Sequence, residues 1–469
     1  MGRSTLFQKI WDDHLVADLG GDTSLLLVDR VLLHERTGGV ALRSLAAAGR
    51  QVLAPQQAFA TMDHVVDTFP GRSDKTMMPT GTAFIAATRD ATKAAGITLF
   101  DLGDSRQGIV HVVSPEQAIV LPGLTLVCPD SHTSSQGALG ALAWGIGSTE
   151  AEHALATSTL RVRRPQTMRV SLTGRLQAGV TAKDVALAVI GRLGSAGARG
   201  HAIEYAGDTV QRLDVEGRLT LCNMAAELSA FTALIAPDDT VFNYLHGRRY
   251  APQGAAWDEA LRSWRQLYTD EGAIFDSDVA IEVGDLGPMV TWGTSPQQAV
   301  SIQDNVPDYA SISHRDTRDG YDRALAYMGL AAGSKLEGLP IDAAFIGSCT
   351  NSRLSDLRRA ASLLRGRRVA AGVKAVVVPG STRVKKDAEA EGLDRTFREA
   401  GFEWRESGCS MCFFAGGEHF PSGARVITST NRNFEGRQGP GTRSHLGSPE
   451  MVAASAIAGS IADPRKYGA

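Results

Sequence analysis

The sequence has few cysteines, almost no net charge and no long apolar run. Five cysteines in 469 residues, an odd and sparse set, exclude a secreted fold held together by disulfides. No run approaches the roughly 18 apolar residues of a transmembrane helix, and the charged N-terminal stretch lacks the form of a signal peptide. A formal charge of −3 gives no general reason to expect nucleic acid or an anionic membrane as a partner. A reduced, cytoplasmic setting is expected.

The length predicts more than one domain. A chain of 469 residues exceeds what one hydrophobic core usually holds, so two to three domains of about 100–200 residues are expected. The basic stretch that ends at Pro165 predicts one boundary, and the charged stretch 300–335 predicts a linker. We expect α/β domains at 1–165, 166–310 and 311–469.

Three cysteines stand where strands are expected to end. Cys349 follows the apolar run 343–346, a pattern typical of a buried parallel strand. Cys409 and Cys412 follow a second short apolar run. A structural zinc ion needs four ligands, whereas a [4Fe–4S] cluster held by three thiolates leaves one iron without a protein ligand. A redox pair, half a zinc site and two buried small residues remain open as alternatives.

Acid and imidazole side chains follow three expected strands in the first third of the chain. Residues 58–64 deliver Asp63 and His64, the run 108–113 carries His111, and 124–128 leads into Asp130-Ser131-His132. A buried acid beside an imidazole is costly unless it is paired or used, so these are site candidates, and a structural pair is the alternative. In open α/β sheets ligands bind at the carboxyl ends of strands, which predicts one cleft lined by all three.

Further candidates lie later in the sequence. Glu204 ends the expected strand 202–205, and Cys222 is expected as buried filler at the start of a helix. The glycine-rich stretch 137–148 lacks the Lys-Ser/Thr ending of a phosphate loop, so close helix packing is the better explanation. Arg432 and Arg437 stand five residues apart in a glycine-bearing loop, which suits bidentate binding of carboxylates.

Together these motifs resemble the aconitase superfamily, and within it the large subunits of the 3-isopropylmalate dehydratases. The resemblance runs nearly from end to end. It is carried by residues 60–64, 107–111, 130–133, 216–224, 347–353, 409–412 and 431–438. It implies three α/β/α domains around a central cleft that holds an iron–sulfur cluster, without the family's mobile fourth (swivel) domain.

The resemblance also assigns roles. Cys349, Cys409 and Cys412 would hold a [4Fe–4S] cluster. The groups that would handle water, hydroxide and the proton are Asp63, His64, His111, Asp130, Ser131, His132 and Glu204. The groups that would bind the substrate are Asn351, Asn431, Arg432 and Arg437.

In this family the base that removes the substrate proton is a serine on the fourth domain, which this chain is expected to lack. The resemblance therefore implies a small-subunit partner that supplies the serine. The implied reaction is isomerisation of 2-isopropylmalate to 3-isopropylmalate through isopropylmaleate, in leucine biosynthesis. Departures at residues 35–40, Val65, Gln136 and 413–417 leave open a relative acting on another 2-alkyl or 2-aryl malate. An RNA-binding apo-protein and a zinc-bound structural protein are the alternatives of other classes.

Overall fold

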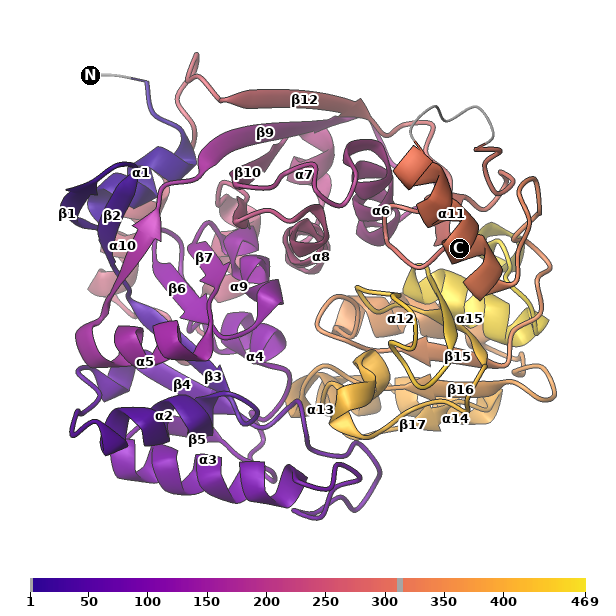
Figure 1. Ribbon diagram of the computed structural model, residues 1–469, viewed down its shortest axis with the longest axis horizontal. Coiled ribbons are helices and arrows are strands. Elements are labelled where there is room, and N and C mark those ends of the chain that lie inside the picture. Colours follow the sequence, from indigo (N-terminus) through magenta and orange to yellow (C-terminus); the bar gives the residue numbers. More distant parts are fainter. Residues whose placement is uncertain (1–2, 310–314) are drawn as a thin grey trace. The chain divides into compact units, whose positions relative to one another are not determined.

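A computed structural model describes residues 3–309 and 315–469, and its elements are labelled in Figure 1. The chain forms two compact units, which are described separately. Unit 1 comprises Met1–Val66, Ser73–Gly174 and Ala196–Glu282, and unit 2 comprises Asp67–Arg72, Arg175–Ser195 and Val283–Ala469. Among the described residues, no helix is both long and apolar enough to cross a membrane.

Unit 1 contains a parallel five-stranded sheet of order β5-β4-β3-β6-β7. Its strands are β3 (Arg30–His34), β4 (Ala58–Thr61), β5 (Thr98–Phe100), β6 (Thr125–Cys128) and β7 (Leu142–Gly145). The order reverses direction between β3 and β6, which are neighbours although β4 and β5 come between them in sequence. Loops after such neighbours leave to opposite sides and open a crevice at the carboxyl edge of the sheet.

Helices accompany this sheet. They are α2 (Gly38–Ala47), α3 (Gly81–Ala95), α4 (Val110–Gln117) and α5 (Ser148–Thr157), and α2 packs against both α3 and α5 (Figure 1). A 3₁₀ helix, η1 (Pro55–Gln57), precedes β4, and a second, η2 (Ser131–Leu139), follows β6. The apolar face of α1 (Leu6–Asp13) joins the same hydrophobic core through Leu6, Phe7, Ile10 and Trp11.

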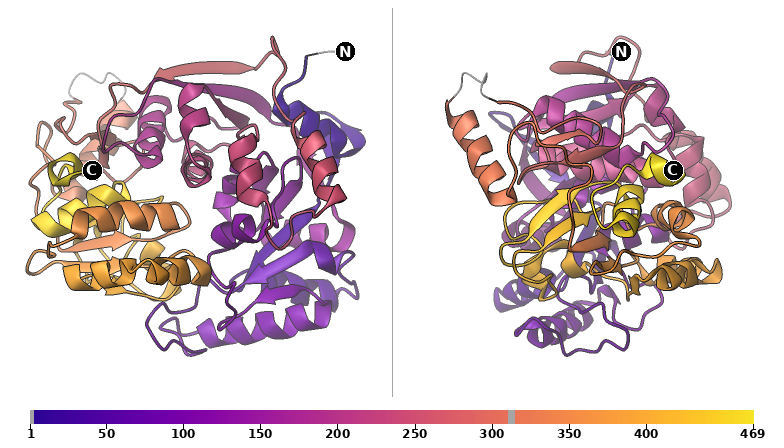
Figure 2. Two further views of the ribbon diagram at one scale, coloured as in Figure 1. Left: turned by 180° about the vertical axis from the view of Figure 1, so that it is seen from behind. Right: turned by 90° about the vertical axis from the view of Figure 1, so that its right-hand side faces the viewer.

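A second parallel sheet of unit 1 has the order β11-β10-β9-β12. Its strands are β9 (Gln166–Thr173), β10 (His201–Ala206), β11 (Thr232–Leu234) and β12 (Ser277–Glu282), and β9 and β12 run side by side in Figures 1 and 2. The accompanying helices are α7 (Asp208–Arg212), α8 (Val215–Met224), η3 (Ala225–Leu228), α9 (Asp239–Leu245) and α10 (Ala255–Trp264). A three-stranded antiparallel sheet is formed by β1 (Leu15–Gly20), β2 (Thr23–Leu27) and β8 (Thr159–Arg163).

Unit 2 repeats the strand order of the first sheet. Its parallel sheet is β17-β16-β15-β18-β19, and the order reverses between β15 and β18. The strands are β15 (Ala343–Ile346), β16 (Lys374–Val377), β17 (Glu403–Trp404), β18 (Arg425–Thr428) and β19 (Arg443–Leu446). A hairpin pairs β13 (Met289–Thr291) with β14 (Ala299–Ser301).

The helices of unit 2 are α6 (Ala182–Leu193), α11 (Arg315–Met328), α12 (Leu354–Leu364), α13 (Thr382–Ala390), α14 (Leu393–Ala400) and α15 (Pro449–Ala458). Helix α12 packs against α13, α14 and α15. The 3₁₀ helices are η4 (Ser410–Cys412), η5 (Phe414–Gly416) and η6 (Pro464–Tyr467).

Two local predictions were wrong. The run 108–113, expected as a strand, begins α4, in which all eight residues are buried. Tertiary packing overrides the β propensity of its valines, and the Asp63 carboxylate accepts a hydrogen bond from the first backbone N–H of the helix. Cys222 lies near the end of α8 rather than at the start of a helix.

The predicted linker 300–335 contains the whole of α11, while its residues 310–314 lie outside the described residues. Each predicted segment, 1–165, 166–310 and 311–469, contains one of the larger parallel sheets. The three-domain division remains a prediction.

The glycine-rich stretch serves close packing. A Cβ added at Gly137, within η2, would lie 1.7 Å from the carbonyl oxygen of Ala233 in β11. The backbone carbonyl of Gly137 also accepts a hydrogen bond from Ile235 N–H at 3.0 Å. Gly137 therefore lets η2, which begins with Ser131 and His132, lie directly on the backbone of the neighbouring strand.

We expect Gly137→Ala to lower the unfolding midpoint, with a cost of about 1–3 kcal/mol or more, because a backbone atom cannot move aside cheaply. Gly320→Ala, within α11, is the matched control, since nothing lies within 4 Å of its added Cβ. Alanine there favours the helix by about 1 kcal/mol. Thermal unfolding of both variants checks this, and equal midpoints would contradict the close approach.

Candidate functional site

The loops after β3, β4 and β6 of unit 1 carry acid and imidazole side chains at the reversal of strand order. His34 is the last residue of β3 and Glu35 follows it. The loop after β4 carries Asp63 and His64, and Asp130 stands before η2. Parallel strands end at one edge of their sheet, so the predicted convergence follows from the topology.

His64 is held between two carboxylates. Its Nδ1 lies 2.6 Å from Asp63 Oδ1, and its Nε2 lies 3.3 Å from Asp130 Oδ2. The other oxygen of Asp63 accepts the Val110 N–H at 2.8 Å. Burial would raise the pKa of Asp63, but the charge and hydrogen bond of His64 outweigh it and the pKa is lowered. An ionised Asp63 fixes one ring nitrogen of His64 and favours a proton on the other.

Asp130 joins the three histidines. Besides His64, it contacts His111 Nε2 at 2.9 Å and accepts the His132 N–H at 2.8 Å. Burial opposes its charge, yet these hydrogen bonds hold the pKa of Asp130 well below its usual range. His132 Nε2 in turn lies 3.0 Å from Glu227 Oε1. These six side chains, Asp63, His64, His111, Asp130, His132 and Glu227, are called the acid–imidazole group below.

Glu227 was missed by the sequence analysis, which singled out Glu204 instead. Glu227 lies in η3, four residues after Asn223 in the motif around Cys222. That spacing places the two on one side of a helical segment and could have indicated it. The Glu204 carboxylate accepts hydrogen bonds from the Thr269 hydroxyl, 2.7 Å from each oxygen, and burial raises its pKa. A catalytic role for Glu204 remains a prediction, as does that of Ser131, the exposed first residue of η2.

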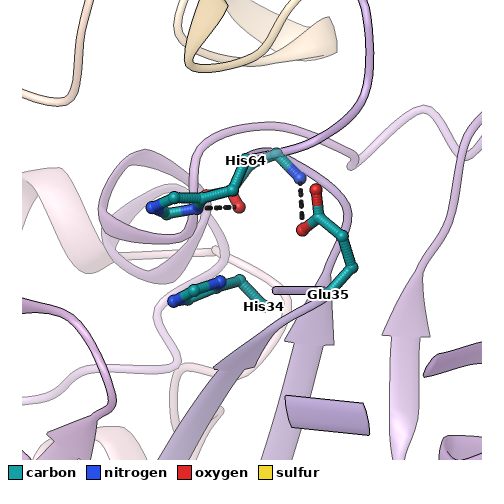
Figure 3. A group of neighbouring side chains, drawn as sticks. His34, Glu35 and His64 are labelled. Carbon is teal, nitrogen blue, oxygen red and sulfur yellow. Dashed lines mark hydrogen bonds and ion pairs between the residues drawn. The ribbon is translucent and has the colours of Figure 1, made fainter. Parts of the chain in front are cut away.

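His34 and Glu35 support the turn that carries His64 (Figure 3). The rings of His34 and His64 stack at 3.9 Å between centroids and 17° between planes. The buried Glu35 carboxylate accepts the backbone N–H groups of Asp63 at 3.0 Å and Val65 at 2.6 Å. Burial and the nearby Asp63 charge raise the pKa of Glu35 to about 7. Glu35 thus fixes the backbone on both sides of His64.

His34 is a neutral member of this arrangement. Burial, followed by the nearby His64 charge, lowers its pKa to about 4. Its Nε2 lies 3.2 Å from the Pro129 carbonyl oxygen, while Nδ1 is buried without a hydrogen-bond partner. Ligand atoms of His34, Glu35, Asp63 and His64 lie within 4.8 Å of one another, as in a metal site. Because both carboxylates already accept protein donors, we interpret these residues as a hydrogen-bonded support for His64.

The three predicted cysteine ligands lie in unit 2, at the carboxyl edge of its sheet. Cys349 follows β15, while Cys409 directly precedes η4 and Cys412 is its last residue, after β17. The Ser348 Oγ lies 4.0 Å from Cys349 Sγ and 3.2 Å from Cys412 Sγ. Asn431 also reaches both, with Nδ2 3.4 Å from Cys349 Sγ and Oδ1 3.9 Å from Cys412 Sγ. Chain segments about 60 residues apart are thus brought together at these thiols.

The donor set fits an iron–sulfur cluster. The three cysteines are in no disulfide and are each 7–8% exposed, and hydroxyl and amide groups that can hydrogen-bond sulfur lie beside Cys349 and Cys412. The other two cysteines differ. Cys128 and Cys222 are fully buried, and burial raises the pKa of both thiols well above the ordinary value. They are packing residues, as the sequence indicated for Cys222.

The loop after β18 brings the Arg437 guanidinium to the Cys412 thiol. Arg437 Nη2 lies 3.8 Å from Cys412 Sγ, and its Nε is buried without a hydrogen-bond partner. Its guanidinium lies 5.4 Å from the ring centre of Phe413 and 5.1 Å from that of Phe434. Arg432, half-buried, stands next to Asn431 at the start of this loop. A cation beside two aromatic rings and the Cys412 thiol suits an anionic ligand.

Two buried side chains, Lys183 and Asn351, hydrogen-bond within or next to these loops. Lys183, in the first turn of α6, donates to the carbonyl oxygens of Ser429 (3.0 Å) and Thr430, directly before Asn431. The Asn351 amide donates to Asp356 in the first turn of α12 at 3.1 Å. These contacts fix the backbone from which the predicted substrate-binding side chains extend.

His34→Gln should make the free energy of unfolding depend less on pH between pH 7 and 4. In the folded chain His34 stays neutral down to about pH 4, whereas in the unfolded chain its pKa is near the ordinary 6.5. Between these values only the unfolded chain takes up the proton, so the wild type loses stability as pH falls. Unfolding measured from pH 7 to 4 should show the variant losing up to about 3 kcal/mol less than the wild type.

His153→Gln, at an exposed position of α5, is the control and should follow the wild-type profile. Parallel curves for all three proteins would contradict a buried, neutral His34.

Known proteins match this chain over most of its length. The sequence model of the Aconitase family (aconitate hydratase) matches residues 8–459. The 3-isopropylmalate dehydratase large subunit 1 of Bradyrhizobium diazoefficiens is 53% identical over 461 residues, which cover 98% of this chain and 96% of that protein. The holo-form structure of aconitase X from Thermococcus kodakaraensis aligns with a TM-score of 0.46 and 14% identity, covering 87% of this chain and 84% of that one. The family match spans nearly the whole chain and confirms the predicted fold class: this chain belongs to the aconitase family.

Proposed function

We propose that this chain is the large subunit of a hydro-lyase that interconverts 2-isopropylmalate and 3-isopropylmalate through isopropylmaleate, in leucine biosynthesis. The observation that carries the proposal is 53% identity over 98% of the chain to a protein named 3-isopropylmalate dehydratase large subunit. The acid–imidazole group supports it, and so do the three cysteines with the neighbouring Arg437. Five cysteines without a disulfide are in keeping with a reduced compartment, and we propose the cytoplasm.

The proposed cofactor is a [4Fe–4S] cluster held by Cys349, Cys409 and Cys412. Three thiolates leave one iron without a protein ligand, and that iron would supply Lewis-acid stabilisation of the substrate hydroxyl and a carboxylate. Ser348 and Asn431 are placed to hydrogen-bond the ligand sulfurs, which orients the thiols.

The acid–imidazole group would handle the proton of the departing hydroxyl. Hydroxide is a poor leaving group and needs a proton donor within hydrogen-bond reach. His64 fits this role because Asp63 fixes its Nδ1 and Asp130 lies at Nε2, so a proton on the ring is stabilised from both sides. The network that can hold this proton extends further: His111 contacts Asp130, and Glu227 contacts His132.

Arg437 and Arg432 would bind the substrate carboxylates. Removal of a proton next to a carboxylate builds negative charge, which a fixed guanidinium offsets. The rings of Phe413 and Phe434, which both lie close to the Arg437 guanidinium, limit its rotamers, so less freedom is lost when an anion binds. The amides of Asn351 and Asn431 are proposed to complete this binding surface.

The catalytic serine is proposed to come from a small-subunit partner, as the name of the relative, a large subunit, suggests.

The chain reconstituted with iron and sulfide should therefore be nearly inactive with 2-isopropylmalate alone and gain activity on addition of a small subunit. A missing general base typically costs 10²–10⁴-fold in rate. The assay follows the absorbance of the unsaturated isopropylmaleate. Full turnover by the isolated chain would contradict the partner requirement, and no turnover with any partner would contradict the proposed reaction.

A second candidate acts on a bulkier 2-alkyl or 2-aryl malate, and one observation favours it. Phe434 is 50% exposed and Phe414 is 44% exposed, and Phe434 lies against the guanidinium of Arg437. Such rings could pack against a larger apolar substituent of a bound malate.

A substrate panel separates the two candidates. With the small subunit present, kcat/KM for 2-isopropylmalate should exceed that for citramalate and for a benzyl-substituted malate by at least about tenfold, since one methylene in an apolar pocket is worth about 1–3 kcal/mol. A higher kcat/KM for the benzyl-substituted malate than for 2-isopropylmalate would instead support the second candidate, provided that Phe434→Leu abolishes this preference.

A further inference from the structure

The Cys409–Cys412 loop contains a strained backbone position. Ser410, directly after Cys409, has a φ of +47°, in the left-handed region that favours glycine. A residue with a Cβ in this conformation costs on the order of 1–2 kcal/mol. Such a conformation persists only where the surroundings enforce it, so the contacts of Ser410 identify what holds the loop.

Two buried groups make those contacts: the Glu418 carboxylate, and the Thr68 hydroxyl, which donates to Ser410 Oγ at 3.0 Å. Glu418 is 3% exposed and accepts the Ser410 hydroxyl at 2.6 Å. It also accepts the Thr68 hydroxyl at 2.9 and 2.8 Å and the Thr68 backbone N–H. Arg405, 2% exposed, donates from Nη1 at 3.0 Å and balances the charge. Each oxygen of this carboxylate thus accepts from at least one donor, which a buried charge needs in order to be stable.

Glu418 also joins two chain segments. The Thr68 carbonyl accepts the Glu406 N–H at 2.7 Å, and Arg72 donates to the Ser407 carbonyl. The segment 67–72 therefore lies along residues 405–407, directly before the Cys409–Cys412 loop. The carboxylate ties this segment to the loop through Ser410.

We propose that Glu418 is a positioning residue for the metal-binding loop: through Ser410 and Thr68 it holds Cys409 and Cys412 ready to receive the iron–sulfur cluster. The inference rests on the proposed function for the identity of the cluster. It predicts a loop that keeps its shape without metal, so that a cluster can be lost and rebuilt without refolding of the ligand loop.

The test compares variants in two measurements. The variants are Ser410→Ala, Ser410→Gly, Glu418→Ala and Glu418→Gln. The matched control is Glu403→Ala, which removes the other carboxylate on Arg405 (Oε2 3.0 Å from Nε) and leaves Glu418 in place. The first measurement is amide hydrogen exchange of the metal-free chain in peptides covering 67–72 and 405–416. The second is the rate at which the reconstituted chain releases iron to a chelator.

Ser410→Ala and Glu418→Ala should speed exchange of the Thr68 amide and of the loop, and iron release, about tenfold, as expected for one hydrogen bond to a charged group. Ser410→Gly relieves the backbone strain and should fall between Ser410→Ala and the wild type. Glu418→Gln keeps one acceptor oxygen and should rescue part of the effect. Glu403→Ala should match the wild type in both measurements.

Wild-type rates in Ser410→Ala and Ser410→Gly would overturn the proposal, and so would equal effects of Glu403→Ala and Glu418→Ala. Should Glu418→Ala fail to fold, the two Ser410 variants decide. The exchange measurement needs no iron. A wild-type chain that takes up no cluster would therefore refute the proposed cofactor, while exchange alone would decide whether Glu418 positions the loop.

Discussion

The strand order of the parallel sheets determines where chemistry can take place in this protein. In each five-stranded sheet the order reverses between the first and fourth strands of the sequence. Loops at such a point diverge, and backbone groups and side chains at the strand ends stay available to a ligand instead of the core. In unit 1 the reversal lies between β3 and β6, which end at His34 and before Asp130. In unit 2 it lies between β15 and β18, which lead into Cys349 and Asn431. Each unit therefore presents its reactive groups at the equivalent edge of its own sheet.

The buried ionisable side chains around His64 differ in their ionisation, because their hydrogen-bond donors and neighbouring charges differ. Asp63 and Asp130 are buried carboxylates whose pKa values are nevertheless lowered, because imidazoles and backbone N–H groups donate to them. Glu35 accepts two backbone N–H groups, but burial and the Asp63 charge raise its pKa to about 7. Burial and the nearby His64 charge lower the pKa of His34 to about 4, which keeps that ring neutral. An imidazole between two ionised acids, with a neutral ring stacked on it, is suited to holding and delivering a proton.

Much of this arrangement could be predicted from the sequence, and the omissions have physical causes. Short apolar runs that end in polar residues located Asp63, Asp130 and Cys349. This works because strands of a parallel sheet are buried and apolar, whereas the loops that follow them can carry polar side chains. His111 was placed on a strand, since a run of valines cannot reveal that a carboxylate caps a helix there. Glu227 was missed because its partner, His132, is 95 residues away in sequence. Glu418 gave no signal either, since its role depends on donors from three residues, Thr68, Arg405 and Ser410, that only the fold brings to one carboxylate.

The convergence of three thiols is the central claim, and iron uptake by single-cysteine variants tests it most directly. After anaerobic reconstitution, native mass spectrometry and absorbance near 400 nm report whether a [4Fe–4S] unit is bound. The account predicts that the wild type, Cys128→Ala and Cys222→Ala bind the cluster, and that Cys349→Ala, Cys409→Ala and Cys412→Ala do not hold it intact. Uptake by Cys349→Ala equal to that of the wild type, or loss of uptake in Cys222→Ala, would contradict it.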